Sequence, residues 1–168
     1  ANVSRQIITL ADEAVIKETK DFFELAIAGA DLGIWDWRIP EERVLQNDRW
    51  KTMLGYQPQE LDERFATLFN LVHVEDQERV RRAIFDYIEG RSHAYSIEFR
   101  LRRKNGGYHW VLSRGRIVER DALNRPVRMI GTHLDIQEQK LRERELELRV
   151  HEINAARSML EQQAVELE

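Results

Sequence analysis

The chain has 168 residues, of which 42% are hydrophobic and 33% charged, so it is long enough for one ordinary domain with some length to spare. It contains no Cys, which excludes disulfides, thiolate zinc sites, a cysteine nucleophile and cysteinyl-flavin photochemistry. No apolar run approaches the roughly 18 residues of a membrane helix. A signal-peptide pattern is absent at the start. We therefore expect a cytoplasmic segment without membrane contact.

The N-terminal part is predicted to be helical, because apolar residues recur at helical spacing and no Gly or Pro occurs before Gly29. One long helix is the simplest interpretation, with a break near Thr19–Asp21 left open. After Gly33 the pattern changes. Leu32–Arg38 predicts a short aromatic strand, and Arg43–Gln46 its partner strand.

Short helices are predicted next. Asn47 or Asp48 would cap a helix that runs to about Leu54. Phe65–Val72 indicates a helical turn, and Glu75–Glu89 an amphipathic helix followed by Gly90.

Three strands follow. Ala94–Arg103 alternates apolar and polar residues, and the turn after it contains Asn105 and two glycines. Tyr108–Glu119 and Val127–Leu134 are the second and third strands. Together with the two earlier strands they predict an α+β fold with a five-stranded antiparallel sheet and helices on one face.

The C-terminal segment, residues 136–168, contains no Gly or Pro and reads as one helix of roughly 50 Å. Apolar residues recur every seven positions, and Glu143 and Arg157 interrupt the seam. A helix of this length cannot bury its apolar stripe against one small domain, so we expect a partner helix.

Residues 91–128 are basic, with ten Lys or Arg against three acids, although the net charge of the chain is −4. One interpretation is a nucleic-acid-binding face. We favour the other, in which these residues form the solvated face of strands and neighbouring acidic helices neutralise them.

Several motifs carry a family resemblance: Gly33–Trp37, Trp50–Tyr56 with Glu60 and Leu61, Val72 and His73 with Glu75 and Asp76, residues 97–111, and residues 131–136. In this order they resemble a PAS sensor domain of the PAS fold-3 type with its PAC segment and signalling helix, over about residues 20–138. Two positions depart from the family pattern: Gln137 stands where the family has Thr, and Val74 where it has Pro.

The resemblance implies an N-terminal helix (1–19), a PAS/PAC domain (20–135) and a signalling coiled-coil helix (136–168). It implies a sensory and dimerisation module of a bacterial-type signalling protein that passes a signal to an effector beyond Glu168. A histidine kinase is the favoured effector and a diguanylate cyclase the second choice. We expect no catalytic residues in this segment, and nucleic-acid binding by residues 91–128 remains the alternative function.

No metal site is expected, because the five His are scattered without ligand spacing. Haem and non-covalent flavin are not expected either, and we assign His73 a loop or capping role. His109 and His133 are expected to be partly exposed or hydrogen-bonded. An unidentified small-molecule ligand stays open. The candidate pocket-lining residues are Trp50, Phe69, Ile97, Phe99, Trp110 and Met129.

We expect a parallel homodimer held by the terminal helices, through Ile8, Val15, Phe22, Leu146, Val150, Ile153, Leu160 and Leu167. Signal transmission is assigned to the junction of Asp135, Ile136, Gln137 and Glu138. Asp135 would cap the helix, accepting from Gln137 or Glu138, and Glu138 would reach back to the Asp135 backbone. Arg102 or Arg103 is the expected second partner of Asp135.

Overall fold

The computed structural model describes residues 2–166, with the side chains of residue 6 and residues 9–165. Its elements follow the predicted order. They are α1 (Asn2–Ala30), β1 (Gly33–Arg38), β2 (Arg43–Gln46), α2 (Asp48–Thr52), the 3-10 helix η1 (Pro58–Glu60), α3 (Phe65–Phe69), α4 (Val74–Ile88), β3 (Tyr95–Arg102), β4 (Tyr108–Arg120), β5 (Pro126–Asp135) and α5 (Gln137–Glu166).

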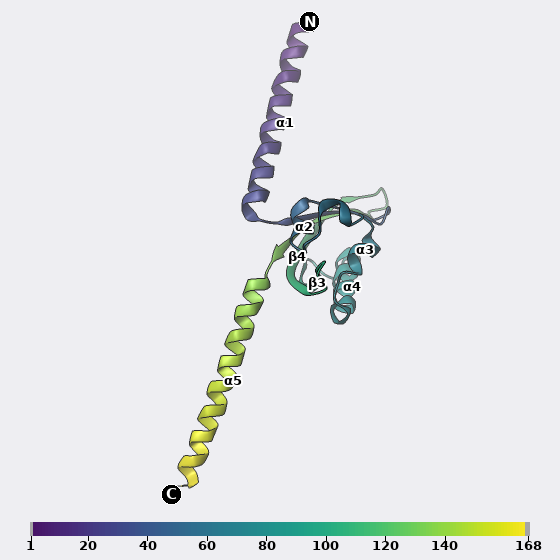
Figure 1. Cartoon of the computed structure of the whole chain (residues 1–168). Helices are drawn as coiled ribbons and strands as arrows, with labels where there is room; N and C mark the ends of the chain where they lie inside the picture. Colours follow the sequence, from purple (N-terminus) through teal and green to yellow (C-terminus); the bar gives the residue numbers. More distant parts are fainter. Residues whose placement is uncertain (1, 167–168) are drawn as a thin grey trace.

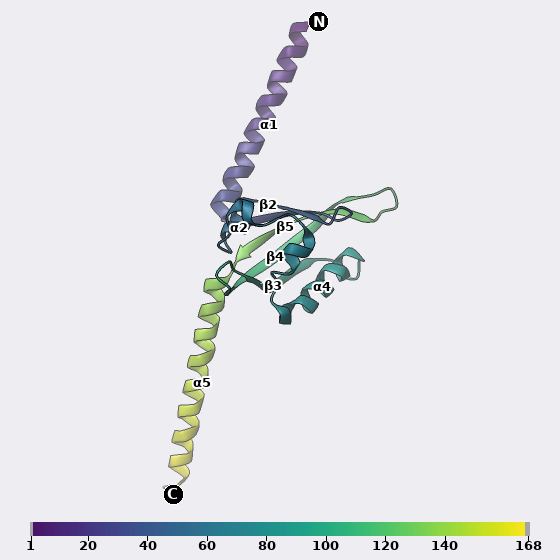
Figure 2. The ribbon, with the colours of Figure 1, turned by 45° about the vertical axis from the view of Figure 1, so that its right-hand side comes forward.

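The five strands form one antiparallel sheet in the order β2-β1-β5-β4-β3, so the predicted α+β class is confirmed. The short helices and α4 connect β2 to β3 across one face of the sheet (Figure 2). The hydrophobic core lies between these helices and the sheet, because alternate side chains of each strand point to that face.

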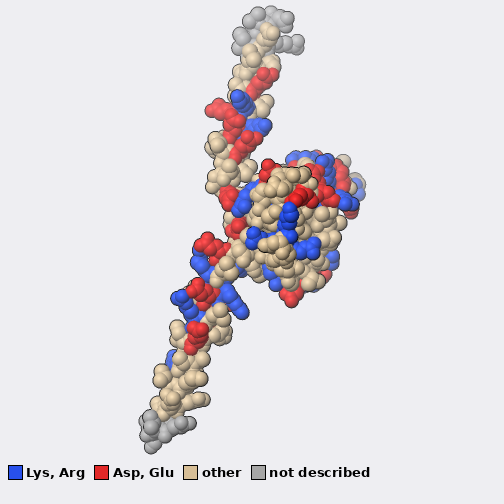
Figure 3. All heavy atoms as spheres, viewed as in Figure 1, with Lys and Arg blue, Asp and Glu red and all other residues tan. Residues whose placement is uncertain are grey.

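The two long helices leave the sheet in opposite directions, so the first turn of α1 and the last turn of α5 lie far apart (Figure 1). Helix α1 is continuous to Ala30, without a break near residues 19–21. In the view of Figure 3, charged residues of both signs lie along α1 and along the part of α5 nearest the domain. Within residues 2–166, no helix combines the length and apolar character needed to cross a membrane.

A row of four residues across the sheet sets the shape of the core. In register, Tyr95 lies beside Gly115, Gly115 beside Gly131, and Gly131 beside Trp35. A Cβ atom on Gly131 would lie 2.2 Å from the indole of Trp35, and one on Gly115 would lie 2.4 Å from it. The two glycines therefore provide the space in which the Trp35 ring lies over the sheet and reaches Tyr95.

The start of α4 is attached to the edge strand β3. The carboxylate of Asp76 accepts hydrogen bonds from the Arg100 backbone N–H at 3.0 Å and from its guanidinium at 2.9 Å. Burial alone would raise the pKa of Asp76, but these hydrogen bonds and the Arg100 charge lower it to about 2. His73 caps α4, since its Nδ1 accepts from the Glu75 backbone N–H at 3.2 Å, which confirms the predicted capping role.

Candidate functional site

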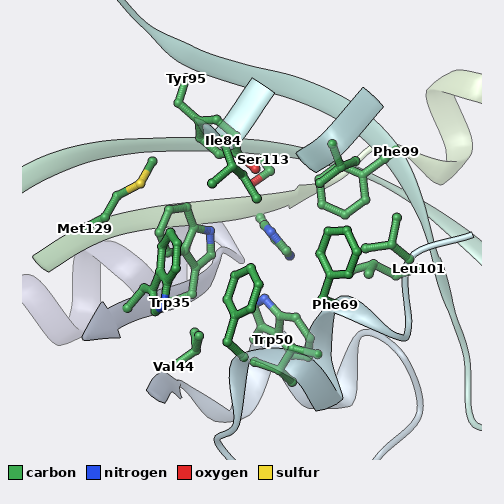
Figure 4. Close-up of a pocket in the computed structure, with 16 residues that line it drawn as sticks. Trp35, Val44, Trp50, Phe69, Ile84, Tyr95, Phe99, Leu101, Ser113 and Met129 are labelled. Atoms are coloured by element: carbon green, nitrogen blue, oxygen red, sulfur yellow. The ribbon is translucent and has the colours of Figure 1, made fainter. Parts of the chain in front are cut away.

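A cavity lies between the sheet and helices α2 to α4, and about 80 Å³ of it is open to the centres of water molecules. Four of the predicted pocket residues line it: Trp50, Phe69, Phe99 and Met129. Figure 4 shows side chains from the sheet and from the short helices converging on this space. The structure therefore brings most of the predicted pocket together.

Ile97 and Trp110 are not among the lining residues. Ile97 is half-buried and packs against the core beside the cavity. Trp110 lies on the opposite face of the sheet, because β4 alternates and its neighbours His109 and Val111 point into the core. There the Trp110 ring lies 5.3 Å from the guanidinium of Arg100 and 5.1 Å from the ammonium of Lys140.

His133 is a lining residue that sequence reasoning missed. It lies opposite Ser113 in register, and its ring is 5.4 Å from Trp50 and 5.7 Å from Phe99. Burial lowers its pKa to about 3, so the imidazole is neutral near pH 7. We expected His133 and His109 to be partly exposed or hydrogen-bonded. Both are buried, each 7% exposed, so partial exposure was wrong, whereas His109 does have a polar partner, because its Nε2 lies 2.8 Å from a carboxylate oxygen of Asp135. Extending the alternation from Met129 through Gly131 would have placed His133 inside.

Metal binding has no support in the part of the chain that the structure describes. No group of three or more His, Cys, Asp or Glu side chains there could hold an ion. The cavity itself is lined mainly by aromatic and aliphatic side chains, with a few polar groups.

Asp135 forms the predicted helix cap at the start of α5. Its Oδ1 accepts a hydrogen bond from the Gln137 backbone N–H at 3.0 Å. The predicted Arg102 or Arg103 partner was wrong. Instead, His109 Nε2 lies 2.8 Å from Asp135 Oδ1, and Arg49 Nη2 lies 3.7 Å from Oδ2. The reason is the sheet order: β4 lies between β5 and β3, so the nearest side chains come from β4 and α2.

The first residues of α5 are attached to β4 through the backbone of Trp110. The Ile136 N–H donates to the Trp110 carbonyl at 3.1 Å, and the Trp110 N–H donates to the Gln137 side-chain oxygen at 2.9 Å. Ile136 itself is buried. Gln137 therefore contacts the sheet through its amide side chain in place of the family's Thr.

Glu138 does not reach back to the Asp135 backbone. Its carboxylate pairs with Arg142 one turn along the helix, which is a favourable i, i+4 arrangement. Lys140, one turn after Ile136, pairs with Glu98 of β3 and covers the Trp110 ring. Sequence reasoning missed Lys140, although its spacing from Ile136 places both on one helix face.

Arg49 connects the two ends of the domain. Its guanidinium makes a two-pronged contact with Asp31, the residue after α1, at 2.7 and 2.9 Å. The same guanidinium lies 3.7 Å from Asp135, the last residue of β5, whose side chain caps α5. One side chain of α2 therefore contacts the end of α1 and the start of α5.

The basic segment is partly neutralised by acids. Five of its ten cations have carboxylate partners: Arg91, Arg100, Lys104, Arg125 and Arg128. The Arg128 partner is Asp36 of β1, at 2.7 Å. These pairs favour the interpretation that neighbouring acids balance the strands, and the nucleic-acid alternative stays a prediction.

The apolar residues assigned to dimerisation are exposed in the single chain. Phe22 is 68% exposed and Leu146 62%, and the other described members are similar: Val15, Val150, Ile153 and Leu160. The side chain of Ile8, and Leu167 as a whole, lie outside the described residues. Neither terminal helix packs these described side chains against the sheet domain of the same chain.

The fold is an antiparallel five-stranded sheet with a cavity under short helices, and a long helix follows it. This is the architecture of a sensor domain. The chain belongs to the PAS fold family, whose family model matches residues 43–133. Within the described residues there is this sensor domain with its flanking helices and no catalytic domain.

Solved structures agree with the family assignment. A sensory box histidine kinase/response regulator from Burkholderia thailandensis superposes with a TM-score of 0.69 at 30% identity, covering 79% of this chain and 98% of that chain. The N-terminal domain of a diguanylate cyclase with a PAS/PAC sensor from Marinobacter aquaeolei gives 0.58 at 19% identity, covering 65% and 98%. The second likeness shows the fold alone.

Among curated proteins, the Non-motile and phage-resistance protein of Caulobacter vibrioides is 27% identical over 127 residues. The match covers 71% of this chain and spans only 14% of the length of that protein. This chain is thus a PAS sensor domain like those found in histidine kinases and diguanylate cyclases.

Proposed function

We propose that this domain is the sensory module of a larger signalling protein, a histidine kinase in first place and a diguanylate cyclase in second. A change in the sheet would reach the effector through α5. The observation that carries the proposal is the junction at Asp135. There the helix start is bonded to β4 through Ile136 and Gln137, and to α2 through Arg49.

The junction can transmit a movement because its contacts come from different elements. His109 belongs to β4 and faces the core, whereas Arg49 belongs to α2, which also supplies Trp50 to the cavity. A shift of β4 or α2 therefore changes the partners of Asp135, and with them the first turn of α5.

The test joins this chain through α5 to a histidine kinase catalytic core and measures autophosphorylation without added stimulus. Asp135→Ala removes the cap and both side-chain partners, so we expect basal output to change several-fold. Glu145→Ala is the matched control, since it removes a carboxylate of α5 that pairs with Arg149 and lies outside the junction. Circular dichroism checks that both variants fold. Equal output in Asp135→Ala and wild type would refute the coupling.

The proposal includes a parallel homodimer through α1 and α5, because an effector after α5 needs both copies at the same end. The exposed heptad residues of α5 support it. Ile153→Asp places a charge in this seam, and His151→Asp places the same charge on a position outside it. Light scattering at tens of micromolar should give a dimer mass for wild type and His151→Asp, and a lower mass for Ile153→Asp. A monomeric wild type would contradict the proposal.

A further inference from the structure

The cavity contains polar atoms that have no partner within the described residues. They are the indole N–H groups of Trp35, Trp37 and Trp50, three residues that line the cavity. Trp35 is 7% exposed and Trp50 is 3% exposed, so bulk water does not reach these groups. Buried polar groups in proteins are nearly always hydrogen-bonded. Three unpartnered indole N–H groups around one space therefore point to an occupant that pairs with them.

The chemistry of these groups restricts the occupant. An indole N–H is a donor only, so the three Trp side chains require acceptors. Trp35, Trp50 and Ser113 come from β1, α2 and β4 and lie around the same space (Figure 4). An occupant with more than one acceptor atom could satisfy donors from several elements at once.

The lining also restricts the charge of the occupant. It includes no Lys, Arg, Asp or Glu, and its one titratable imidazole, His133, is kept neutral by burial. An ion placed there would lack a counter-charge, which is costly in an apolar interior. The aromatic rings around the space favour a flat molecule.

We propose that this cavity binds a small, uncharged, planar molecule of about one ring that carries hydrogen-bond acceptors toward the indole N–H groups. The size follows from the 80 Å³ open to water centres, which corresponds to on the order of six non-hydrogen atoms. The inference of binding rests on the cavity alone, whereas the role of the bound molecule as the input signal rests on the proposed sensory function.

The four Trp residues of the chain make a direct test possible, because three line the cavity and Trp110 lies on the opposite face. Pyrazine is the probe, as an uncharged ring with two acceptor atoms. Benzene, which has the same size without acceptors, and pyrazine-2-carboxylate, which carries a charge, are the matched controls. The readout is the set of four indole N–H signals in an NMR titration of the full chain.

We expect pyrazine to shift the signals of Trp35, Trp37 and Trp50 saturably, with a dissociation constant in the millimolar range, and to leave Trp110 unmoved. Trp50→Phe, which keeps a ring and removes the N–H, should weaken binding roughly tenfold, whereas Trp110→Phe should leave the affinity unchanged. Benzene and the carboxylate should bind more weakly than pyrazine.

Three results would overturn the proposal. The first is the absence of a saturable shift with a well-dispersed wild-type spectrum, which would mean that water alone satisfies the donors. The second is equal binding of pyrazine and either control, because acceptors or neutrality would then be irrelevant. The third is a visible absorption band of the purified chain, which would mark a larger flavin or haem group. Binding without any effect on the kinase chimera would instead refute the sensory function and leave the site standing.

Discussion

Replacing Gly131 with Ala tests how the sheet accommodates Trp35. The added Cβ would lie 2.1 Å from the carbonyl oxygen of Arg114 and 2.2 Å from Cζ2 of Trp35. The carbonyl belongs to the neighbouring strand β4 and cannot move without disturbing the pairing of β4 with β5. Both the ladder and the indole must therefore adjust to a single methyl group.

The magnitude can be ranked against two other glycines. Overpacking a core costs about 1–3 kcal/mol, and Gly131→Ala should lie at the upper end because backbone is in the way. At Gly115 the nearest atoms are the ends of the Trp35 and Met129 side chains, which can move, so the loss should be smaller. Gly29 lies in α1 with nothing within 4 Å, and Ala there should stabilise the helix by at most ~1 kcal/mol.

Urea unfolding followed by Trp fluorescence measures these differences in the free energy of unfolding. The expected order of stability is Gly29→Ala and wild type first, then Gly115→Ala, then Gly131→Ala. If the free energy of unfolding of Gly131→Ala lies within about 0.5 kcal/mol of the wild-type value, which is the scatter expected of a surface change, the glycine row does not set the position of Trp35.

Two further predictions concern pH. Because the folded pKa of Asp76, about 2, is below its ordinary value, its stabilisation of about 2 kcal/mol is complete above pH 4 and is lost as the pH falls through 2. Asp76→Asn should be less stable at pH 7 and lack this acid-dependent loss, and a parallel loss in both proteins would argue against the Arg100 clamp. His133 also has a folded pKa below its ordinary value. The free energy of unfolding therefore falls as the pH is lowered from 6.5 to about 3, because in that window only the unfolded chain takes up the proton. In urea unfolding across that window, His133→Gln should show a flatter pH dependence than wild type, and an unchanged slope would mean that His133 is solvated.

The regular elements could be predicted because each has a local pattern. In β3 the alternation of Tyr95, Phe99 and Leu101 with polar residues identified a strand with one buried face, and the structure confirms it. Helix α4 was predicted from its apolar face and its terminal Gly90. Local periodicity indicates which face of an element is buried, and it needs no information on neighbouring elements.

The partners of the junction residues could not be predicted in the same way. The choice of His109 and Arg49 as partners of Asp135 depends on which strand lies beside β5, and no local pattern contains the order of the sheet. Trp110 was misplaced for a related reason: an aromatic residue suits either face of a sheet when a helix covers part of the outer one. Here the outer cover is the first turn of α5.

This placement gives β4 a position between the cavity and the output helix. Its residues alternate, so Val111 and Ser113 face the core, whereas the ring of Trp110 faces Lys140 of α5. The backbone of Trp110 is also bonded to Ile136 and Gln137. A one-residue slip of the strand would exchange the two faces, so under the proposed function we expect an occupant of the cavity to shift or tilt β4 as a unit. Because the outward contacts of β4 are with the first turn of α5, such a shift would act on that helix where it begins.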